Sequence, residues 1–469
     1  MKLWQLLAGV PLTGEPYFQE MEITSISYDT RTLLPGALFV ALPGAKTDGS
    51  LYIDEALAKG AAAVVCRRRP QREGVFFTTP DPRRALALLA ENWFGHPGRE
   101  MTLIGVTGTN GKTTTTFLIK EMLEGALKTQ VGLIGTIQNM VGERVLPAHR
   151  TTPESYEVQQ LLREMADSGC THVVMEVSSH ALVQHRVEGL DFSVAAFTNL
   201  TQDHLDYHHT MEEYTNAKKN IFLHQGEGDR LILNYDNEVT RSMAAEAVCP
   251  VTWFSRKERL EEGVYLRDNA IWLTNEMGSR EVLPLSDIQL PGVHNIENYM
   301  AAIAAVDGLV PDKCVRAVAR RFHGVEHRIE LVRELDGVKY YNDSIGTSPS
   351  RTTACLESFN QKIILIAGGY DKGVPFTQLG VEIVGHVKAL FLTGNTAGAI
   401  RQAVEQAPGY AESGMILAET EDLAAAVAAA RQAAKPGDVV VLSPACAAFD
   451  HFKNFMERGQ VFKKLVQEL

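Results

Sequence analysis

Short runs of apolar residues alternate with stretches of helical spacing along most of this chain. In the first hundred residues, "GALFVALPG" (36–44) and "AAAVVCR" (61–67) predict strands, and 52–60 between them predicts a helix that ends at a glycine. Further apolar runs repeat the alternation at 101–108, 172–179, 192–200, 230–236, 362–369, 387–394 and 438–444. Strands that alternate with helices predict α/β domains built on parallel sheets.

Two breaks in this alternation divide the chain. "FGHPGRE" (94–100) is typical of a linker because Gly and Pro interrupt helices, and a third zone begins near "FHGVEHRIE" (322–330). We therefore predict three domains: a small α/β domain at 1–97, a central doubly wound parallel sheet at 98–323, and a C-terminal Rossmann-like α/β domain at 324–469.

Composition narrows the class of protein. The net charge of −12 argues against a general nucleic-acid binder, and the chain has no apolar span of 18 residues that would cross a membrane. The six cysteines are scattered without a Cys-x-x-Cys pair, which suits a reducing compartment. The first residues lack the pattern of a secretion signal, so we expect a cytoplasmic enzyme, and no feature of the sequence indicates its oligomeric state.

The segment "VTGTNGKTTTTFL" (106–118) has the pattern of a phosphate-binding loop. It joins a predicted buried strand to a helix start, where backbone N–H groups bind phosphate, a lysine adds charge and a hydroxyl reaches Mg²⁺. Its first glycine stands two positions later than in the commonest form of this loop. The residues expected to bind ATP here are Gly108, Thr109, Asn110, Gly111, Lys112, Thr113 and Thr114.

The loop "GTNGKTT" resembles that of the Mur ligase family, ATP-dependent ligases that build the peptidoglycan stem peptide. Folylpolyglutamate synthase carries a related loop, but 27–56 resembles the uridine-binding domain of the Mur family instead. "TTPES" (151–155), "MEVSSHALVQHRV" (175–187), "NLTQDHLDYHHTMEEYTNAK" (199–218) and "GVHNIENYMAA" (292–302) look like the members that form the UDP-muramoyl tripeptide. This resemblance covers about residues 20–330.

The resemblance implies a set of catalytic residues, namely Lys112, Glu176, His204 and Lys218. Thr113, Glu176, His204 and Lys218 would hold two Mg²⁺ ions, with Lys218 carrying a carbamate formed from CO2. Such a modification needs an uncharged amine, hence a lysine whose pKa is lowered by burial or by nearby cations. Glu176 follows an apolar strand, which is the usual place for active-site groups in an open α/β sheet.

The remaining ligand contacts are also implied by the resemblance. Asn295 and Asn298 would lie near the adenine of ATP, and Arg328 and Asp343 near its phosphate and ribose. The UDP-muramoyl peptide would contact Thr30, Ala45, Lys46, Thr47, Thr151, Thr152, Ser178, Gln184 and Arg186. Of these, Arg186 would grip a D-glutamyl carboxylate with two hydrogen bonds.

The third domain implies a different product from the front of the chain. Its motifs "YYNDSIGTSPSRT" (340–352), "IAGGYDKGVPF" (366–376) and "LSPACAAFDHFKNFMERG" (442–459) resemble the members that add D-glutamate, and the Asp-Asn-Pro-Arg motif of diaminopimelate-adding members is absent. This resemblance places Thr347, Lys372, Ser443 and Phe449 by the amino acid.

Two products are therefore considered. From the front motifs we expect a diamino acid, meso-diaminopimelate or L-lysine, to be added to UDP-N-acetylmuramoyl-L-alanyl-D-glutamate through an acyl phosphate, with release of ADP and phosphate. The alternative is addition of D-glutamate to UDP-N-acetylmuramoyl-L-alanine. An ATP-binding protein without ligase activity is disfavoured because all four expected catalytic residues are present.

Overall fold

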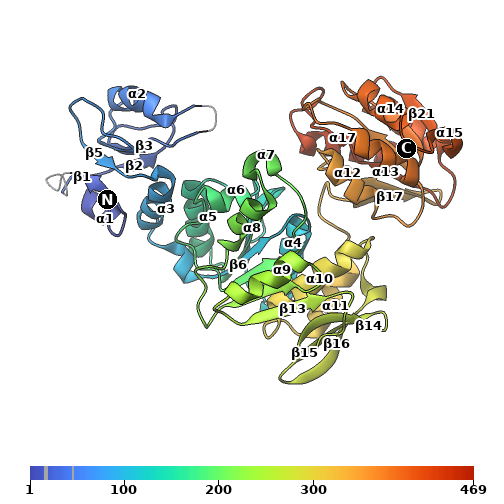
Figure 1. Cartoon of the computed structure of the whole chain (residues 1–469), viewed down its shortest axis with the longest axis horizontal. Helices are drawn as coiled ribbons and strands as arrows, with labels where there is room; N and C mark the ends of the chain where they lie inside the picture. The colour runs from blue at the N-terminus through green and yellow to red at the C-terminus, as the bar shows by residue number, and fades with distance from the viewer. Residues whose placement is uncertain (15–19, 45–46) are drawn as a thin grey trace. The chain divides into compact units, whose positions relative to one another are not determined.

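The computed structural model describes residues 1–14, 20–44 and 47–469. Ala45 and Lys46, predicted to contact the uridine, lie outside the described residues. The chain forms two compact units, one made of Met1–Pro284 with Glu297–Val318 and the other of Leu285–Ile296 with Ala319–Leu469. The expected fold class is confirmed, since each of three sheets is flanked by helices (Figure 1).

The first sheet has the order β1-β5-β4-β3-β2, in which only β1 runs antiparallel to its neighbour. Its two central strands are fully buried, as their Val- and Ala-rich sequences predict. Asp81 caps the longest helix of this part by accepting hydrogen bonds from the N–H groups of Arg83 and Arg84. The elements are α1 (Leu3–Leu6), β1 (Thr13–Gly14), β2 (Ser25–Ser27), β3 (Ala37–Val40), η2 (Gly49–Tyr52), α2 (Ile53–Ala58), β4 (Ala63–Cys66), β5 (Phe76–Thr78), α3 (Pro82–Trp93) and η3 (Pro97–Glu100).

The second sheet has the order β16-β15-β14-β13-β12-β11-β6-β10-β7-β8-β9, and it lies in the same unit. Strands β14 to β7 in this order are parallel, and antiparallel strands extend both edges. Its strands are β6 (Thr102–Thr107), β7 (Val131–Ile134), β8 (Gln138–Val141), β9 (Arg144–Pro147), β10 (His172–Glu176), β11 (Val194–Phe197), β12 (Arg230–Asn234), β13 (Val251–Ser255), β14 (Gly263–Arg267), β15 (Ala270–Asn275) and β16 (Gly278–Pro284).

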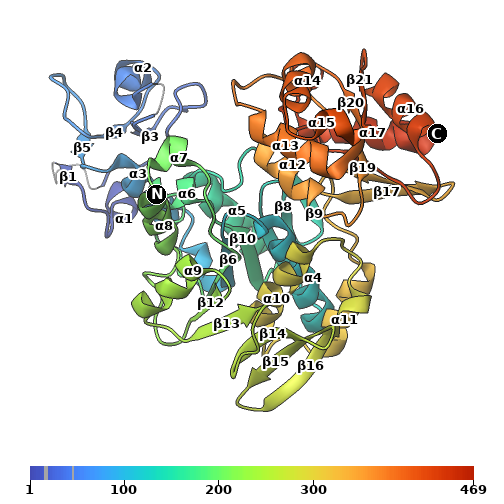
Figure 2. The same ribbon diagram turned by 45° about the vertical axis from the view of Figure 1, so that its right-hand side comes forward.

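Helices cover both faces of this second sheet (Figure 2). One apolar layer packs α5 against alternate residues of β6 and β10, including Leu103, Val173 and Met175. The helices along this part of the chain are α4 (Lys112–Leu127), α5 (Ser155–Asp167), α6 (Ser179–Val183), α7 (Leu205–His208), α8 (Met211–Lys219), α9 (Glu238–Ser242), η4 (Met243–Glu246), η5 (Leu285–Asp287), α10 (Val293–Val306) and α11 (Asp312–Arg321).

The third sheet, in the second unit, has the order β17-β18-β22-β19-β20-β21 and is parallel except for β17. Two separate apolar clusters lie on its opposite faces, so this sheet also has helices on both sides. Its elements are β17 (Glu330–Leu335), β18 (Val338–Asn342), α12 (Pro349–Leu356), β19 (Ile363–Ala367), α13 (Thr377–His386), β20 (Val387–Leu392), α14 (Ala397–Glu405), α15 (Tyr410–Ser413), β21 (Ile416–Glu419), α16 (Leu423–Ala433), β22 (Val439–Leu442) and α17 (Phe455–Glu468).

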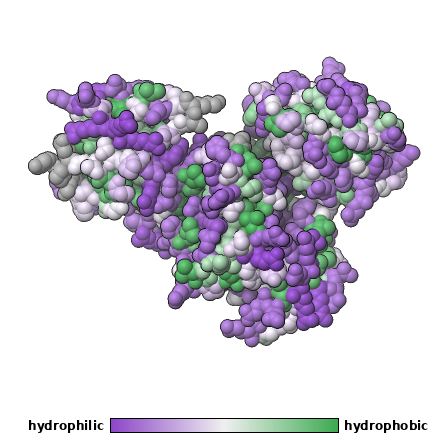
Figure 3. Space-filling view, in the orientation of Figure 1, coloured by the Kyte–Doolittle hydropathy of each residue, from purple (hydrophilic) through white to green (hydrophobic). Residues whose placement is uncertain are grey.

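The face of the molecule seen in Figure 3 is predominantly polar. On the face drawn in Figure 3, hydrophobic residues form small separate areas among hydrophilic ones. Within the described part of the chain, every helix is too short or too polar to cross a bilayer.

Removing apolar bulk from the centre of the third sheet should destabilise the second unit. Leu365 of β19 is fully buried between strands β20 and β22, so we expect Leu365→Ala to lower the free energy of unfolding by about 2–5 kcal/mol. Leu469→Ala is the matched control because Leu469 is 40% exposed, and its effect should stay within about 0.5 kcal/mol. Urea denaturation monitored by hydrogen exchange within β19 measures both, and equal losses would contradict the assigned core.

Candidate active site

The loop after β6 adopts a conformation that only glycine permits at two positions. Gly108 has φ of 140°, and a Cβ there would lie 2.0 Å from Thr198 Oγ1. Gly111 has φ of 88°, and its Cβ would lie 2.2 Å from Asn298 Oδ1. Helix α4 begins directly after Gly111, so the loop presents N–H groups at a helix N-terminus. This geometry binds anions such as phosphate.

Two lysine side chains meet on this loop. Lys112 Nζ donates hydrogen bonds to the carbonyl oxygens of Gly108 at 2.8 Å and Thr109 at 2.9 Å. Lys218 Nζ, from α8, donates to the same Gly108 oxygen at 2.9 Å and to Thr107 Oγ1 at 3.2 Å. Burial and the charge of Lys112 hold the pKa of Lys218 well below its usual value. The buried amine is therefore favoured in its uncharged form.

Glu176 lies at the carboxyl end of β10, next to the loop, and is 1% exposed. Its Oε2 accepts hydrogen bonds from Thr113 Oγ1 and Thr136 Oγ1, both at 2.9 Å. Its Oε1 accepts from the N–H of Thr136 at 2.8 Å. The predicted pair Glu176 and Thr113 is thus brought together, and Thr136 was missed. The only available signal for Thr136 was its place just after β7, a parallel neighbour of β10.

His204 precedes the short helix α7, and its backbone is in the left-handed region with φ of 53°. Its side chain is 49% exposed, and Nε2 lies 3.6 Å from Asp203 Oδ2. The rings of His204 and His180 are nearly perpendicular, edge to face, with their centroids 5.0 Å apart. His204 is therefore accessible to a ligand, whereas Glu176 and Lys218 are buried.

These residues fit Mg²⁺ in their chemistry. Thr113 and Glu176 supply hard oxygen atoms in direct contact with each other, and such ligands suit Mg²⁺. An uncharged Lys218 can react with CO2 to give a carbamate, which would add another anionic oxygen donor. Thr107 and Gly108, which accept hydrogen bonds from Lys218 Nζ, come from the strand end and loop that carry the phosphate site.

The residues expected to hold the acceptor peptide lie on the adjoining strand ends and α6. Thr151 Oγ1 lies 3.1 Å from Thr136 Oγ1, within hydrogen-bond distance, and Thr152 Oγ1 donates to the Glu176 carbonyl at 2.8 Å. Ser178 caps α6 through Ala181 N–H. Gln184 and Arg186 follow that helix and bond to each other.

Arg186 is the most highly connected residue of this group. Its Nη1 donates to the Thr152 carbonyl at 2.9 Å, its Nη2 to Gln184 Oε1 at 2.7 Å, and its Nε lies 3.5 Å from Glu154 Oε1. Glu154 also pairs with Arg83 of α3 at 3.2 Å. The acceptor region of the second sheet is therefore tied to the first sheet by a chain of charged contacts.

The described residues of the expected uridine pocket lie on the first sheet. Thr30 is buried, and its carbonyl accepts a hydrogen bond from Lys59 Nζ at 2.9 Å. Thr47 is exposed, and its carbonyl accepts from the N–H of Gly44 at 3.1 Å.

The expected ATP contacts fall in both units. Asn298 contacts the phosphate loop and Thr115 in the first unit. In the second unit, Asn295 donates to the Pro291 carbonyl at 2.6 Å, and Asp343 Oδ2 accepts from Ser443 Oγ at 2.7 Å. Burial raises the pKa of Asp343 to about 6, while the nearby charge of Arg328 opposes this shift.

The expected amino-acid residues share one end of the third sheet. Lys372 Nζ donates to the Thr347 carbonyl at 3.3 Å, and burial together with the charge of Arg351 lowers the pKa of Lys372. Ser443 follows β22 and bonds to Asp343. Phe449 is 63% exposed and packs edge-on against Tyr370 at 5.9 Å. Thr347, Lys372 and Ser443 thus belong to one cluster of strand-end loops.

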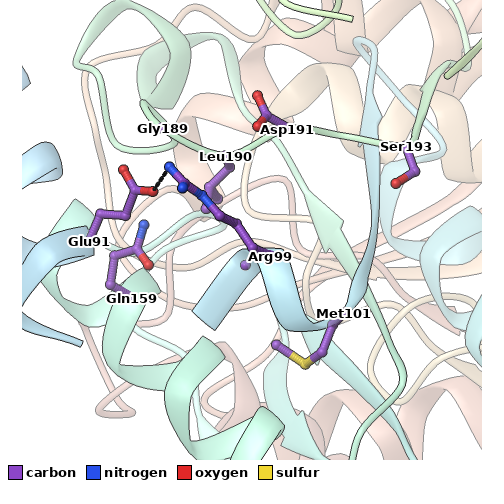
Figure 4. Close-up of a pocket in the computed structure, with 9 residues that line it drawn as sticks. Glu91, Arg99, Met101, Gln159, Gly189, Leu190, Asp191 and Ser193 are labelled. Atoms are coloured by element: carbon purple, nitrogen blue, oxygen red, sulfur yellow. Dashed lines mark hydrogen bonds and ion pairs between the residues drawn. The ribbon is translucent and has the colours of Figure 1, made fainter. Parts of the chain in front are cut away.

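A cavity of about 180 Å³ lies elsewhere in the first unit (Figure 4). Arg99 and the buried carboxylate of Glu91 both line it, and they form an ion pair with an N–O distance of 3.1 Å. Its walls include Met101 and Ser193, which directly precede β6 and β11, whereas the phosphate loop follows β6. The cavity therefore belongs to the opposite end of the strands.

The sheet topology and glycine loop define a nucleotide-dependent enzyme with a phosphate-binding loop. Family models match the chain in three places: "Mur ligase family, catalytic domain" at 22–91, "Mur ligase middle domain" at 106–306 and "Mur ligase, glutamate ligase domain" at 327–446.

Individual relatives extend this match. A protein of Acetivibrio thermocellus named UDP-N-acetylmuramoylalanine--D-glutamate ligase is 45% identical over 370 residues, which are 78% of this chain and 74% of the relative. One of Clostridium botulinum with the same name is 42% identical over 368 residues, with the same two shares. A solved UDP-N-acetylmuramoyl-L-alanyl-D-glutamate--2,6-diaminopimelate ligase shares the fold, with a TM-score of 0.68 and 22% identity over 100% of this chain and 99% of that one.

The chain belongs to the Mur ligase family, the ATP-dependent ligases of peptidoglycan synthesis. The expectation that it adds a diamino acid is wrong, because relatives 42–45% identical over 78% of the chain are named D-glutamate ligases. The expectation rested on front motifs such as 151–155, 175–187 and 199–218, which adjoin the phosphate loop, whereas Thr347 and Lys372 lie on loops of the third sheet. Such motifs therefore carry little information about which amine follows.

Asp343 should make the stability of the second unit depend on pH. Its folded pKa of about 6 exceeds its ordinary value of 3.8, so its stabilising contribution is complete below 3.8 and is lost as pH rises through 6. We expect the stability advantage of the wild-type chain over Asp343→Asn to fall by about 2 kcal/mol between pH 4 and pH 7. Urea denaturation of the second unit at each pH measures this difference. An equal slope for Asp343→Asn, or the same change in the exposed control Asp371→Asn, would contradict it.

Proposed function

We propose that this ligase joins D-glutamate to UDP-N-acetylmuramoyl-L-alanine, with ATP converted to ADP and phosphate. The observation that carries the proposal is the shared name of relatives at 42–45% identity over more than three quarters of the chain. In this proposal, residues 1–97 bind the uridine, 98–323 bind ATP and the peptide, and 324–469 bind the amino acid.

The charges in the second unit support an acidic amino acid. D-Glutamate presents two carboxylates and one ammonium group, so its site needs cations. Lys372 and Arg351 lie close enough for the charge of one to lower the pKa of the other. Both are exposed side chains beside the Thr347 loop, where a carboxylate would neutralise them.

The proposed reaction has two steps. A carboxylate oxygen of the L-alanyl group attacks the γ-phosphorus of ATP, the bond to ADP breaks, and an acyl phosphate forms. The amine nitrogen of D-glutamate then attacks the acyl carbon, phosphate leaves, and the nitrogen loses a proton. The loop N–H groups and Lys112 hold the phosphates and neutralise their charge during the first step.

Magnesium would lower the repulsion between the two reacting anions. Thr113 and Glu176 would hold one ion, and His204 with a carbamate on Lys218 would hold a second. Within the chain, Thr136 fixes Glu176 through two hydrogen bonds, and Gly108 and Thr107 fix the Lys218 nitrogen. These contacts orient the ligands before any ion arrives.

A matrix of acceptors and amino acids tests the proposed product. With ATP and Mg²⁺, we expect phosphate release with UDP-N-acetylmuramoyl-L-alanine and D-glutamate, because these are the acceptor and the amine of the proposed reaction. Lys112→Ala is the inactive control, since it removes the charge at the phosphates. Mass spectrometry identifies the product. Turnover confined to the longer D-glutamyl acceptor and a diamino acid would overturn the proposal.

The proposed role of Lys218, holding Mg²⁺ through a carbamate, should require CO2. We expect Lys218→Ala to lower turnover by about 100-fold or more, the scale of losing one group that stabilises the transition state. Acetate or propionate should restore part of it by replacing the carbamate, and labelled bicarbonate should give a carbamate carbon signal by NMR in the wild-type chain. Lys219→Ala is the matched control, because Lys219 instead pairs with Glu246 at the surface. Full turnover of Lys218→Ala would contradict the assignment.

A further inference from the structure

Tyr207 lies between the residues proposed to bind the acceptor and those proposed to bind metal. It belongs to α7, the helix that begins directly after His204. Its hydroxyl accepts a hydrogen bond from Gln184 Nε2 at 3.0 Å. The other end of the Gln184 amide accepts from Arg186 Nη2 at 2.7 Å. One side of Tyr207 is therefore bonded to the acceptor group of residues.

The ring of Tyr207 contacts the metal side of the site. It lies against the ring of His180, with centroids 4.1 Å apart and planes tilted by 36°. His180 in turn meets the ring of His204 edge to face at 5.0 Å. His180 comes from α6, whose N-cap is Ser178, so the three rings join two segments that are more than twenty residues apart in the chain.

The chain of contacts continues toward the first sheet. Arg186 lies 3.5 Å from Glu154, which pairs with Arg83 at 3.2 Å. Arg83 Nη2 donates to the Pro43 carbonyl at 3.1 Å, in the loop expected to hold uridine. A ligand that shifts Gln184 or Arg186 therefore changes contacts leading to His204 and to the uridine loop.

We propose that Tyr207 is a positioning residue that couples acceptor binding to the orientation of His204. It uses its hydroxyl on Gln184 and its ring on His180, without touching a reacting atom. The inference rests on the proposed roles of the acceptor residues and of His204. The acceptor and the metal then bind cooperatively. By linkage, each raises the affinity of the chain for the other by the same factor.

The coupling can be measured without turnover. Mn²⁺, detected by electron paramagnetic resonance, is titrated into the full chain with and without UDP-N-acetylmuramoyl-L-alanine, and again with the longer D-glutamyl acceptor. In the wild-type chain the acceptor that binds should tighten Mn²⁺ by about fivefold or more. Tyr207→Phe keeps the ring and removes the hydroxyl, so this factor should fall toward one, while Mn²⁺ affinity without acceptor is retained.

Two further variants separate coupling from general damage. Tyr265→Phe also removes a hydrogen-bonded tyrosine hydroxyl, but from β14, four strands away from β6, and should keep the wild-type factor. His180→Ala breaks the contact between Tyr207 and His204 and should lose the coupling even if Tyr207→Phe fails to fold. Steady-state kinetics should show a raised KM for the acceptor in Tyr207→Phe with kcat changed much less.

The outcomes distinguish this inference from the proposed function. The coupling is overturned if the acceptor leaves the Mn²⁺ affinity of the wild-type chain unchanged. It is also overturned if the acceptor tightens Mn²⁺ as strongly in both Tyr207→Phe and His180→Ala as in the wild-type chain. Absence of D-glutamate ligation while the longer acceptor still tightens Mn²⁺ overturns the proposed product and leaves the coupling supported.

Discussion

The carbonyl oxygen of Gly108 receives hydrogen bonds from both Lys112 and Lys218, and the chemistry of the site depends on this convergence. Two ammonium groups so close together repel each other, and Lys218 is also removed from water. Both effects lower the pKa of Lys218, and burial is the larger cause. In the proposed mechanism, Lys112 acts as the cation at the phosphates and Lys218 reacts with CO2. A single backbone atom thus distributes two roles between identical side chains.

The order of the strands supplies the rest of the site. Strands β11, β6, β10 and β7 are successive parallel neighbours, so their carboxyl ends meet at one edge. From this edge come Thr198, the glycine loop, Glu176 and Thr136. Thr198 Oγ1, for example, donates to the carbonyl of Thr107 at the end of β6 at 3.3 Å. Such contacts need no long side chains because the strand spacing already brings the groups together.

Much of this arrangement was predictable from sequence. The apolar strand before "GTNGKTT" predicted the loop conformation, and the strand before Glu176 predicted its place at the sheet edge. The contacts of Thr136 and Tyr207 were not predictable, because each bonds to a residue 23 or 40 positions away through the folded sheet. The added amino acid was predicted wrongly, because the prediction rested on front motifs expected to contact the acceptor, whereas the residues expected to contact the amino acid lie on loops of the third sheet.

Arg186 illustrates why a motif alone misleads about the substrate. The resemblance assigned its guanidinium to a D-glutamyl carboxylate, but two of its nitrogens already donate to Thr152 and Gln184. The buried carboxylate of Glu154 lies beside the third, and burial lowers the pKa of Arg186. Arg186 Nε, although close to this carboxylate, is buried without a hydrogen-bond acceptor among the described residues, so the guanidinium is only partly satisfied within the chain. With the proposed monopeptide acceptor, Arg186 has no D-glutamyl carboxylate to bind, and its contacts would instead hold Gln184 and the Thr152 loop in place.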